Sequence, residues 1–369
     1  MSGGLRDSLS GLFRRSLTDF LPGRQSSVLA VDIGSSCVKL VEADGTPNQV
    51  RILAAGIAPL SPTAVQNNLI QEPDEVAAVI RDLLSQTGAR STEVVTAVPG
   101  PAVMIKKIML PGGDESDLDN QVMLEAGSAI PENLDNVTLD YQVIDYTDRD
   151  EIEVLLVAVK KDILNSYTSV LRQAGLSPKI VDVDYFALEN MFDLNYETDE
   201  GQVVGLVNVG ARYCSMNILR GGRSSFTGDI PVGGAEFTDV LMRNLDLSSE
   251  EAELLKTGGS VGSFERDQID AALTPAVNLL VEEIHRALSF YWRSDAEEPL
   301  AAVYLSGGTS QIQGLAQSLS ERLETPVELA DPLSRVHLAR SANQDFVREN
   351  ASSLAVTIGL AARRSGDKT

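Results

Sequence analysis

Apolar residues along the chain follow two spacings that alternate with one another. Short, almost unbroken apolar runs are typical of buried strands, and the clearest lie at 28–33, 93–98, 203–209 and 301–306. Apolar residues three or four positions apart predict amphipathic helices, most clearly at 72–88, 161–175 and 274–292. Strands that alternate with helices in this way predict a fold of the α/β class.

The predicted helix at 274–292 has a regular apolar stripe. The positions that share this face are Val277, Leu280, Val281, Ile284, Leu288 and Tyr291. We expect the stripe to be buried against a sheet or another helix. His285 falls off it and is expected at the surface rather than in a metal site.

Two segments far apart in the chain, 28–43 and 203–219, share one layout of strand, glycine turn and strand. Laying Gly210 on Gly34 aligns Val207 with Val31, Asn208 with Asp32, and Met216 with Leu40. A long-range repeat of this kind predicts two similar lobes that face one another.

The pattern divides the chain into six parts, because an acidic stretch with strands and helices of its own separates the two repeats. They are an N-terminal arm (1–26), the first part of the first lobe (27–104), an inserted subdomain (105–178), an interdomain connection (179–200), the second lobe (201–345), and a C-terminal hinge helix with its tail (346–369). Apolar residues in the arm roughly follow a helical spacing up to Pro22-Gly23. The arm is therefore either a short docking helix or a loosely ordered segment.

Charge and composition exclude several classes of partner. The 369 residues carry a formal net charge of -23, and that field repels nucleic acid and anionic lipid. No apolar run approaches the roughly 20 residues of a membrane helix, and no secretion signal is recognisable. We expect a cytoplasmic protein with no transmembrane span. The two cysteines, Cys37 and Cys214, are expected to be small buried residues rather than a disulfide or zinc ligands.

The first glycine turn has residues suited to a phosphate. Asp32 ends a strand, Ser35 and Ser36 follow Gly34, and Lys39 lies on the outgoing strand. A carboxylate suits Mg²⁺, usually through water, whereas turn amides, hydroxyls and a lysine suit terminal phosphates. The plainer alternative is a β-hairpin with an ordinary turn aspartate.

Three later segments have similar chemistry. Asn208-Val209-Gly210 repeats the first turn, and the turns at 231–234 and 306–310 both precede helices, where backbone amides bind phosphate. Glu253 and Lys256 are three residues apart and therefore share a helix face. They either bracket a ribose and base or form a plain surface ion pair.

The order of these motifs resembles the actin/DnaK-type/FtsA superfamily of nucleotide-binding proteins. Within it, the stretches at 97–111, 125–144 and 181–192 look most like the PilM family of type IV pilus assembly proteins, over about 28–362. The resemblance implies an actin-like (ribonuclease-H-like) two-lobe fold with an FtsA-like inserted subdomain.

The resemblance also implies a set of site residues. Residues matching the family's nucleotide motifs are Asp32, Gly34, Ser35, Ser36 and Lys39 (phosphate 1), Asn208 and Gly210 (phosphate 2), Gly233 and Gly234, Glu253 and Lys256 (ribose and adenine), and Gly307, Gly308 and Thr309 (adenosine). Asp32 and Asp184 fall where Mg²⁺ is held through water, and Ala187 and Gly359 lie on helices that resemble a crossing pair at the hinge. The family usually has Asp where this chain has Asn208. Because an amide carries no charge, we expect weak hydrolysis or none.

The function implied is that of an ATP·Mg²⁺-binding scaffold at the inner face of the inner membrane. Its partners are the cytoplasmic tail of a PilN-type inner-membrane protein and other pilus assembly components. The expected peptide groove lies between the strands at 141–144 and 151–159 and the helix at 161–175. The alternatives are a kinase or phosphatase of the same superfamily and an FtsA-like division protein.

Overall fold

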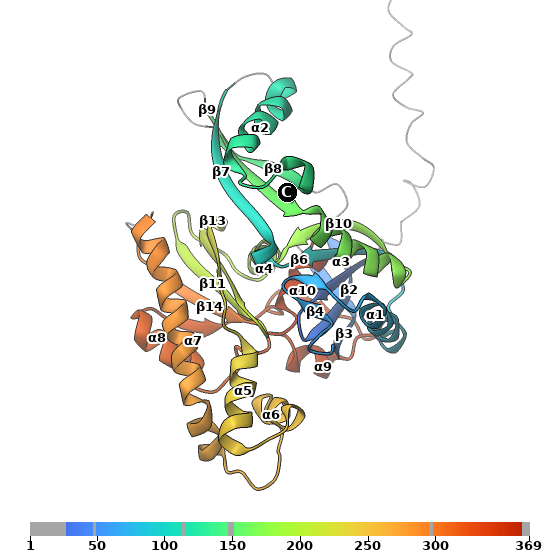
Figure 1. Ribbon diagram of the computed structural model, residues 1–369, viewed down its shortest axis with the longest axis vertical. Helices are drawn as coiled ribbons and strands as arrows, with labels where there is room; N and C mark the ends of the chain where they lie inside the picture. The colour runs from blue at the N-terminus through green and yellow to red at the C-terminus, as the bar shows by residue number, and fades with distance from the viewer. Residues whose placement is uncertain (1–26, 47–48, 113–114, 147–150, 295–297, 364–369) are drawn as a thin grey trace, which may run out of the picture.

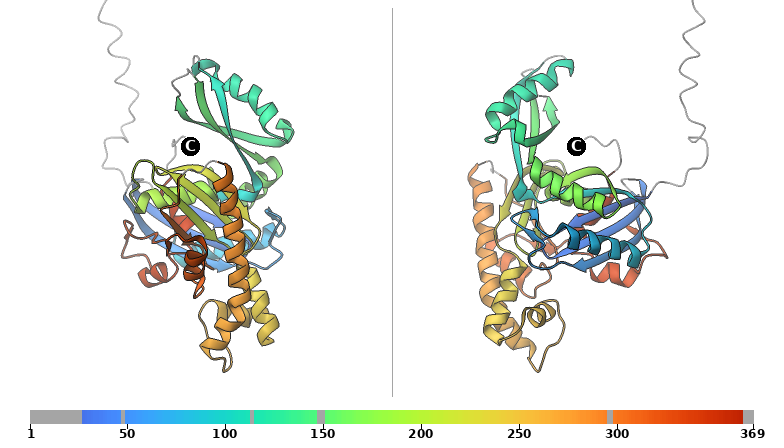
Figure 2. Two further views of the ribbon diagram at one scale, coloured as in Figure 1. Left: turned by 90° about the vertical axis from the view of Figure 1, so that its left-hand side faces the viewer. Right: turned by 45° about the vertical axis from the view of Figure 1, so that its right-hand side comes forward.

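The computed structural model describes residues 27–46, 49–112, 115–146, 151–294 and 298–363 (Figure 1). The predicted N-terminal arm and the last six residues of the predicted C-terminal tail lie outside these ranges. Two lobes built on β-sheets lie side by side, and a smaller subdomain projects from one end of the molecule (Figures 1 and 2).

The first lobe is a six-stranded sheet with helices packed on it. Its strands, in spatial order, are β10 (Ser177–Val183), β6 (Glu93–Val98), β1 (Val28–Ile33), β2 (Cys37–Thr46), β3 (Gln49–Pro59) and β16 (His337–Leu338). The helices are α1 (Pro73–Thr87) and α3 (Lys161–Gln173), and a small hairpin is formed by β4 (Val65–Gln66) and β5 (Leu69–Ile70). Leu29, Ile80 and Tyr167 are buried together in its core, which joins the central strand to both helices.

The second lobe is a five-stranded sheet with a helical layer. Its strands, in spatial order, are β13 (Arg223–Ile230), β12 (Cys214–Arg220), β11 (Val203–Val209), β14 (Ala302–Ser306) and β15 (Val327–Leu329). The helices are α5 (Gly234–Leu245), α6 (Ser249–Lys256), α7 (Arg266–Ser294) and α8 (Leu315–Leu323). The predicted stripe of α7 is buried in this core, as expected. The helix begins at Arg266, eight residues earlier than predicted. Pro275 therefore lies inside the helix rather than near its start.

The predicted internal repeat is confirmed by the strand register. Val31 pairs with Leu40 in β1 and β2, and Val207 pairs with Met216 in β11 and β12. The turns repeat as well: the Gly34 amide donates to the Cys37 carbonyl at 3.0 Å, and the Gly210 amide donates to that of Tyr213 at 3.2 Å.

Two buried helices cross where the lobes meet. They are α4 (Asp184–Asn195) and α10 (Ala355–Ala361), and the short α9 (Gln344–Glu349) precedes the latter. A Cβ atom on Gly359 would overlap the backbone carbonyl oxygen of Ala187. The predicted crossing is therefore present, and at this position only glycine allows the helices to approach so closely.

The projecting subdomain is a three-stranded antiparallel sheet covered on one face by a helix. Its strands are β7 (Val103–Pro111), β9 (Glu151–Lys160) and β8 (Val137–Tyr146), with β9 in the centre, and its helix is α2 (Glu115–Ala129). The short turns η2 (Gly100–Ala102) and η3 (Leu134–Asn136) lead into β7 and β8. Val154, Leu156 and Ala158 of β9 belong to its own core. The alternate residues of β9 point to the face that α2 does not cover.

The boundaries of this subdomain differ from the predicted 105–178. Helix α3 and strand β10 lie in the core and the sheet of the first lobe, because the apolar face of α3 packs with α1 rather than with α2. Likewise β16, which was expected in the second lobe, pairs with β3 of the first. The inserted subdomain therefore spans about 103–160.

Candidate functional site

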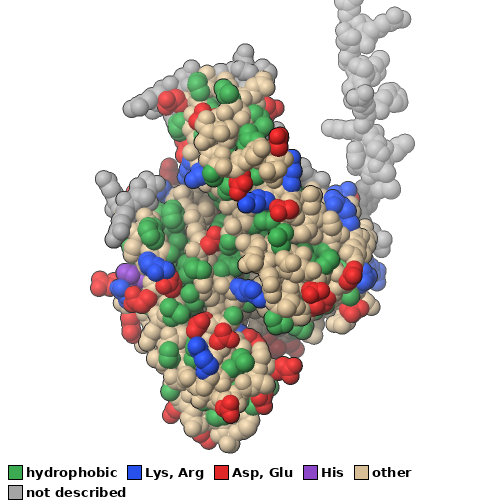
Figure 3. All heavy atoms as spheres, in the orientation of Figure 1, with side chains coloured by type: hydrophobic (Ala, Val, Ile, Leu, Met, Phe, Trp, Pro, Cys, Tyr) green, Lys and Arg blue, Asp and Glu red, His purple; other side chains and the backbone are tan. Residues whose placement is uncertain are grey.

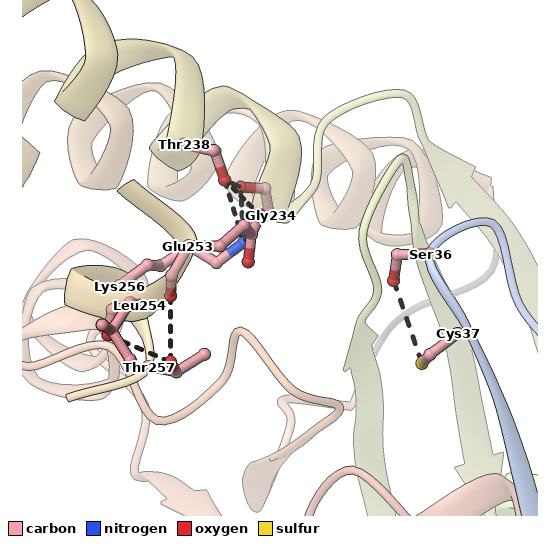
Figure 4. A network of polar contacts seen from close by, with 8 residues as sticks. All are labelled: Ser36, Cys37, Gly234, Thr238, Glu253, Leu254, Lys256 and Thr257. Atoms are coloured by element: carbon pink, nitrogen blue, oxygen red, sulfur yellow. Dashed lines mark hydrogen bonds and ion pairs between the residues drawn. The ribbon is translucent and has the colours of Figure 1, made fainter. Parts of the chain in front are cut away.

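The glycine turns of both lobes come together in what we call the interlobe site. We define it as the β1–β2 turn with its flanks (32–39) and, in the second lobe, the turns at 208–213, 231–234 and 306–309. Figure 4 shows Gly234 and Lys256 on one side of this site and Ser36 on the other.

The first-lobe side of the site carries an ion pair. Asp32 and Lys39 are cross-strand partners, and Lys39 Nζ lies 2.9 Å from Asp32 Oδ2. Burial is the largest single influence on the pKa of Lys39 and lowers it, but the charge and hydrogen bond of Asp32, together with Cys37 and Asp184, outweigh burial and hold that pKa above its usual range. Lys39 is therefore a stable cation beside Gly34, Ser35 and Ser36.

On the second-lobe side, two glycine turns are bonded to each other. The amide of Gly234 donates to the Gly210 carbonyl at 2.8 Å, and that of Ala235 donates to the Ala211 carbonyl at 2.7 Å. A Cβ atom on Gly233 would lie 2.7 Å from the carbonyl oxygens of Gly210 and Ala211. The loop at 231–234 thus places the N-terminus of α5 directly against the phosphate 2 turn.

The predicted pair on α6 is more than a surface ion pair. Lys256 Nζ lies 2.6 Å from Glu253 Oε1, and it also donates to the Gly234 carbonyl at 3.2 Å and to Thr238 Oγ1 at 3.0 Å. Thr238 Oγ1 in turn donates to Glu253 at 2.5 Å. These contacts hold α6 against the first turn of α5 (Figure 4).

The third turn completes the second-lobe side. Gly307 has a φ of +90°, and a Cβ atom there would overlap the Val209 carbonyl oxygen, so the position requires glycine. The amide of Thr309 donates to that same carbonyl at 3.3 Å, and the Thr309 side chain lies against Gly234. Gly308 is exposed beside it.

Asn208 lies near the end of β11, at the position that the repeat aligns with Asp32. Its Oδ1 accepts a hydrogen bond from Ser306 Oγ at 3.4 Å. A Cβ atom on Gly307 would lie 2.8 Å from that same oxygen. The amide is therefore enclosed by the third turn.

Two residues of the β11–β12 turn reach across to the first lobe. Arg212 Nη2 donates to the Pro62 carbonyl at 2.6 Å, and Tyr213 donates its hydroxyl hydrogen to Asp184 Oδ2 at 3.0 Å. Asp184 is the first residue of α4 and is buried, and its Oδ1 has no hydrogen-bond partner. Burial, and then the charge of Asp229, raises the pKa of Asp184 to about 7.

The residues of the interlobe site fit the phosphates and metal of a nucleotide. The glycine turns bring backbone without side chains close to the ligand position, and Lys39 and Lys256 supply cations from the two lobes. Asp32 and the unpartnered Oδ1 of Asp184 are oxygen ligands of the kind that Mg²⁺ prefers. Twelve of the fourteen predicted nucleotide residues lie in the turns that define this site, and the other two, Glu253 and Lys256, lie beside it on α6. Asp184 contacts the site through Tyr213.

A separate pocket of about 820 Å³ lies where the inserted subdomain meets the lobes. We call it the insert pocket and define it by its main walls: β8 (138–144), the uncovered face of β9 (155–159), α3 (164–172), β10 (178–183) and α4 (186–193). Leu155 and Val157 of β9 line it with their apolar side chains. Acidic and basic side chains gather at this junction (Figure 3).

The floor of the insert pocket contains buried charges. Asp182 Oδ2 lies 3.3 Å from Arg363 Nε, and only 1% of the Asp182 side chain is exposed. Burial, and then the charge of Asp193, raises the pKa of Glu189 to about 7. Buried carboxylates of this kind are common at functional sites.

Sequence reasoning missed the residues that join the lobes. The sequence patterns single out neither Arg212 nor Tyr213. Nothing in the local pattern marks them, because their partners are distant in the chain. Cys214 is buried as expected, whereas Cys37 is partly exposed.

The family model for "Type IV pilus assembly protein PilM" matches residues 30–365. Among solved structures, the chain is similar to a PilM-PilN type IV pilus biogenesis complex, with 27% identity, a TM-score of 0.80, and coverage of 91% of this chain and 98% of that one. It is also similar to the ethanolamine utilization protein EutJ from Carboxydothermus hydrogenoformans, with 17% identity, a TM-score of 0.57, and coverage of 93% and 90%.

Curated relatives belong to the cell division proteins. FtsA of Bacillus subtilis is 21% identical, over 82% of this chain and 78% of that protein. FtsA of Escherichia coli K12 is 22% identical, over 54% of this chain and 53% of that protein.

The predicted actin-like two-lobe fold is therefore confirmed. No helix among the described residues is long and apolar enough to cross a membrane.

Proposed function

Because the chain belongs to the PilM family of type IV pilus assembly proteins, we propose that it is an actin-like, ATP-binding scaffold at the inner face of the inner membrane. In this role it holds the cytoplasmic tail of a PilN-type membrane protein and presents it to other components of the assembly machinery. The similar PilM structure was solved as a PilM-PilN complex, which supports the choice of partner.

ATP binds at the interlobe site and draws the two lobes together. Lys39 and the amides of the β1–β2 turn hold the terminal phosphates from the first lobe. From the second lobe, the positive end of the α5 dipole and the charge of Lys256 attract them. Asp32 and Asp184 would hold Mg²⁺ through water, and the ion would neutralise phosphate charge.

Hydrolysis is slow or absent in this function. The repeat aligns Asn208 with Asp32. Because the Asn208 side chain carries no charge, it can neither bind a cation electrostatically nor act as a base. The nucleotide then sets the relative position of the lobes rather than serving as fuel.

The insert pocket is the observation that carries the scaffold proposal. It lies apart from the predicted nucleotide residues, and residues of α3, β8 and β9 line it as expected for the peptide groove. Strand β8 is an edge of its sheet, so an extended peptide can pair with its backbone while apolar side chains contact Leu155 and Val157. The carboxylates at the floor of the pocket, Asp182 and Glu189, can bind a polar or basic side chain of the tail.

The experiment uses a synthetic peptide of a PilN-type cytoplasmic tail and compares two matched variants of the full chain. Leu155→Asp places a charge in the apolar wall of the insert pocket, and we expect it to weaken peptide binding by a factor of about 10 or more. Leu124→Asp makes the same change on α2, where the side chain is 80% exposed, and should leave the affinity unchanged. If both variants bind like the wild type in a calorimetric titration, the pocket is not the partner site.

A further inference from the structure

Four polar residues form a row across the second-lobe sheet, on adjacent strands beside the interlobe site. Cross-strand pairing places Asn208 of β11 between Ser306 of β14 and Ser215 of β12. Ser215 is paired in turn with Asp229 of β13. Residues paired in this way point to the same face of a sheet. Their apolar neighbours along the strands belong to the second-lobe core, so the row points to the opposite face.

This opposite face is turned toward helix α4. Asn217 lies two residues after Ser215 on β12, and its Nδ2 donates to the Tyr185 carbonyl of α4 at 3.0 Å. Ser215 points to the same side, because alternate residues of a strand share a face. Asp184, the first residue of α4, is buried and accepts the hydrogen bond from Tyr213. The polar row and the start of α4 therefore face one another.

Two buried oxygen atoms at this junction lack a hydrogen-bond partner. Asp184 is 6% exposed and Ser215 is fully buried. Neither Oδ1 of Asp184 nor Oγ of Ser215 has a partner among the residues that the structure describes. A buried polar atom without a partner is costly, so such atoms usually contact water or a ligand. Both atoms therefore indicate that this junction holds water or a hydrated ion.

Asp229 brings a carboxylate to the same junction. Its side chain is exposed, so water reaches it. Tyr185 donates its hydroxyl hydrogen to this carboxylate. The Tyr185 ring is fixed in turn, because a Cβ atom on Gly100 would overlap it. After burial, the charge of Asp229 is the strongest influence that raises the pKa of Asp184, ahead of the charge of Asp32. Asp229 is therefore held where its charge acts on a cation beside Asp184.

The charges of the two lobes are arranged differently. In the first lobe, Asp32 is paired across the strands with Lys39, which offsets its charge. In the second lobe the aligned pair, Asn208 and Ser215, carries no charge. The carboxylate of the row is Asp229, two strands from Asn208, or roughly 10 Å at the usual strand spacing. The second lobe therefore presents this carboxylate from β13 rather than from β11.

We propose that Asp229 is a further residue that holds the Mg²⁺ of the nucleotide through water, and that it supplies the negative charge that Asn208 lacks. This rests on the proposed function, because it needs a nucleotide at the interlobe site. Among the described residues, no three histidine, cysteine, aspartate or glutamate side chains are placed to bind a metal ion directly. Binding through water suits Mg²⁺, which keeps several of its water molecules in protein sites. The Asp229 carboxylate and Ser215 Oγ can both accept hydrogen bonds from such water.

The metal dependence of nucleotide binding reports this role directly. Without Mg²⁺ the carboxylate of Asp229 repels the phosphates, whereas with Mg²⁺ it also attracts the cation. The ratio of the dissociation constants without and with the metal cancels the repulsion and leaves the interaction with Mg²⁺. Asp229→Asn should therefore lower this ratio by about 5-fold or more. The amide still accepts the hydrogen bond from Tyr185, so a purely structural role of Asp229 predicts an unchanged ratio.

The experiment titrates the full chain with AMPPNP, an ATP analogue that resists hydrolysis, in a calorimeter. Each protein is measured in Mg²⁺ and in EDTA, and the ratio of the two Kd values is compared. Asp82→Asn removes the same charge from the exposed face of α1 and should leave the wild-type ratio unchanged. A wild-type ratio in Asp229→Asn overturns the role of Asp229. Absence of binding by the wild type in both conditions instead overturns the proposed function.

A double variant tests whether the two positions share one role. Asn208→Asp, introduced into Asp229→Asn, returns a carboxylate to the row at the position aligned with Asp32. It should restore most of the lost ratio, because the total charge of the row is again that of the wild type. A ratio that stays low in the double variant would show that a carboxylate in place of Asn208 cannot replace Asp229, and would overturn the idea that one charge stands in for the other.

Discussion

The β1–β2 turn of the first lobe and the β11–β12 turn of the second share a backbone hydrogen-bond pattern but carry different side chains. Both close with a glycine amide bonded to the carbonyl three residues on, at 3.0 and 3.2 Å. The aligned positions differ: Asp32, Ser36, Cys37 and Lys39 in the first turn correspond to Asn208, Arg212, Tyr213 and Ser215 in the second. The first turn carries a cross-strand ion pair, whereas the second sends two side chains across to the other lobe.

The difference indicates that the two copies of this strand–turn–strand unit have different roles. The backbone sets where amides can hold a phosphate, and it is retained in both copies. The side chains decide whether a copy supplies charge to the ligand or contacts between lobes.

The largest expected effect concerns Asp184, the carboxylate that the second turn contacts. Its pKa is raised to about 7, so the folded state keeps its proton at a pH where the unfolded chain has lost it. Stability is therefore present below about pH 4 and is lost as the pH rises through 7. In Asp184→Asn this loss is removed. Without nucleotide or metal, we expect the variant to gain up to about 4 kcal/mol relative to wild type between pH 4 and 8.

Urea unfolding at several pH values measures this difference. Asp229 and Glu189 are also raised in pKa and lose stability in the same direction, but they are unchanged in the variant. Equal pH profiles for the two proteins would contradict the burial argument for Asp184.

The next effect concerns the crossing that joins the two halves. Gly359→Ala would place a methyl group on the backbone carbonyl of Ala187, and we expect a loss of about 3 kcal/mol in the free energy of unfolding. Gly127→Ala in α2 is the matched control, because a Cβ atom there meets nothing within 4 Å. It should be neutral or stabilising by up to about 1 kcal/mol. Similar melting temperatures for the two variants would show that the helices do not cross so closely.

Asn208→Asp makes the second turn resemble the first. We expect wild-type ATP turnover to be slow or absent. The restored charge should raise it by on the order of 10²-fold, if the missing carboxylate is what limits it. Phosphate release in single-turnover and steady-state assays measures this. Wild-type turnover of several per second would contradict the prediction.

The smallest effect comes from Arg212→Ser, which gives the second turn the residue of the first at that position. The variant loses one exposed hydrogen bond to Pro62, so the free energy of unfolding should fall by no more than about 1 kcal/mol. A loss several times larger in urea unfolding would mean that Arg212 is a main connection between the lobes.

Local pattern predicted much of this fold and little of its long-range contacts. The strands, the repeat and the small residues at the crossing each leave a short signal, such as Gly34 on Gly210 or the stripe of α7. The place of α3 was wrong because an amphipathic helix shows that it has a buried face but not which sheet covers it. Strand β16 has two residues and no pattern of its own.

The predicted site residues could be named from sequence because family motifs point to them one by one. The contacts of Tyr213 with Asp184 and of Asn217 with Tyr185 join residues about 30 positions apart, on different elements. The insert pocket gathers residues from Val98 to Arg363. No single stretch of sequence contains such a pocket, so its position becomes visible only in three dimensions.

The central claim is that the two unlike turns hold one ATP·Mg²⁺ between them, and a thermal melt tests it directly. Binding at about 100 times Kd stabilises the folded state by about 2.7 kcal/mol, which raises the melting temperature by several degrees in a chain of this size. We expect this shift for the wild type at millimolar ATP with Mg²⁺, and we expect it to vanish in Asp32→Ala while the fold is retained. A wild-type melting temperature that does not change with ATP·Mg²⁺ would contradict the account.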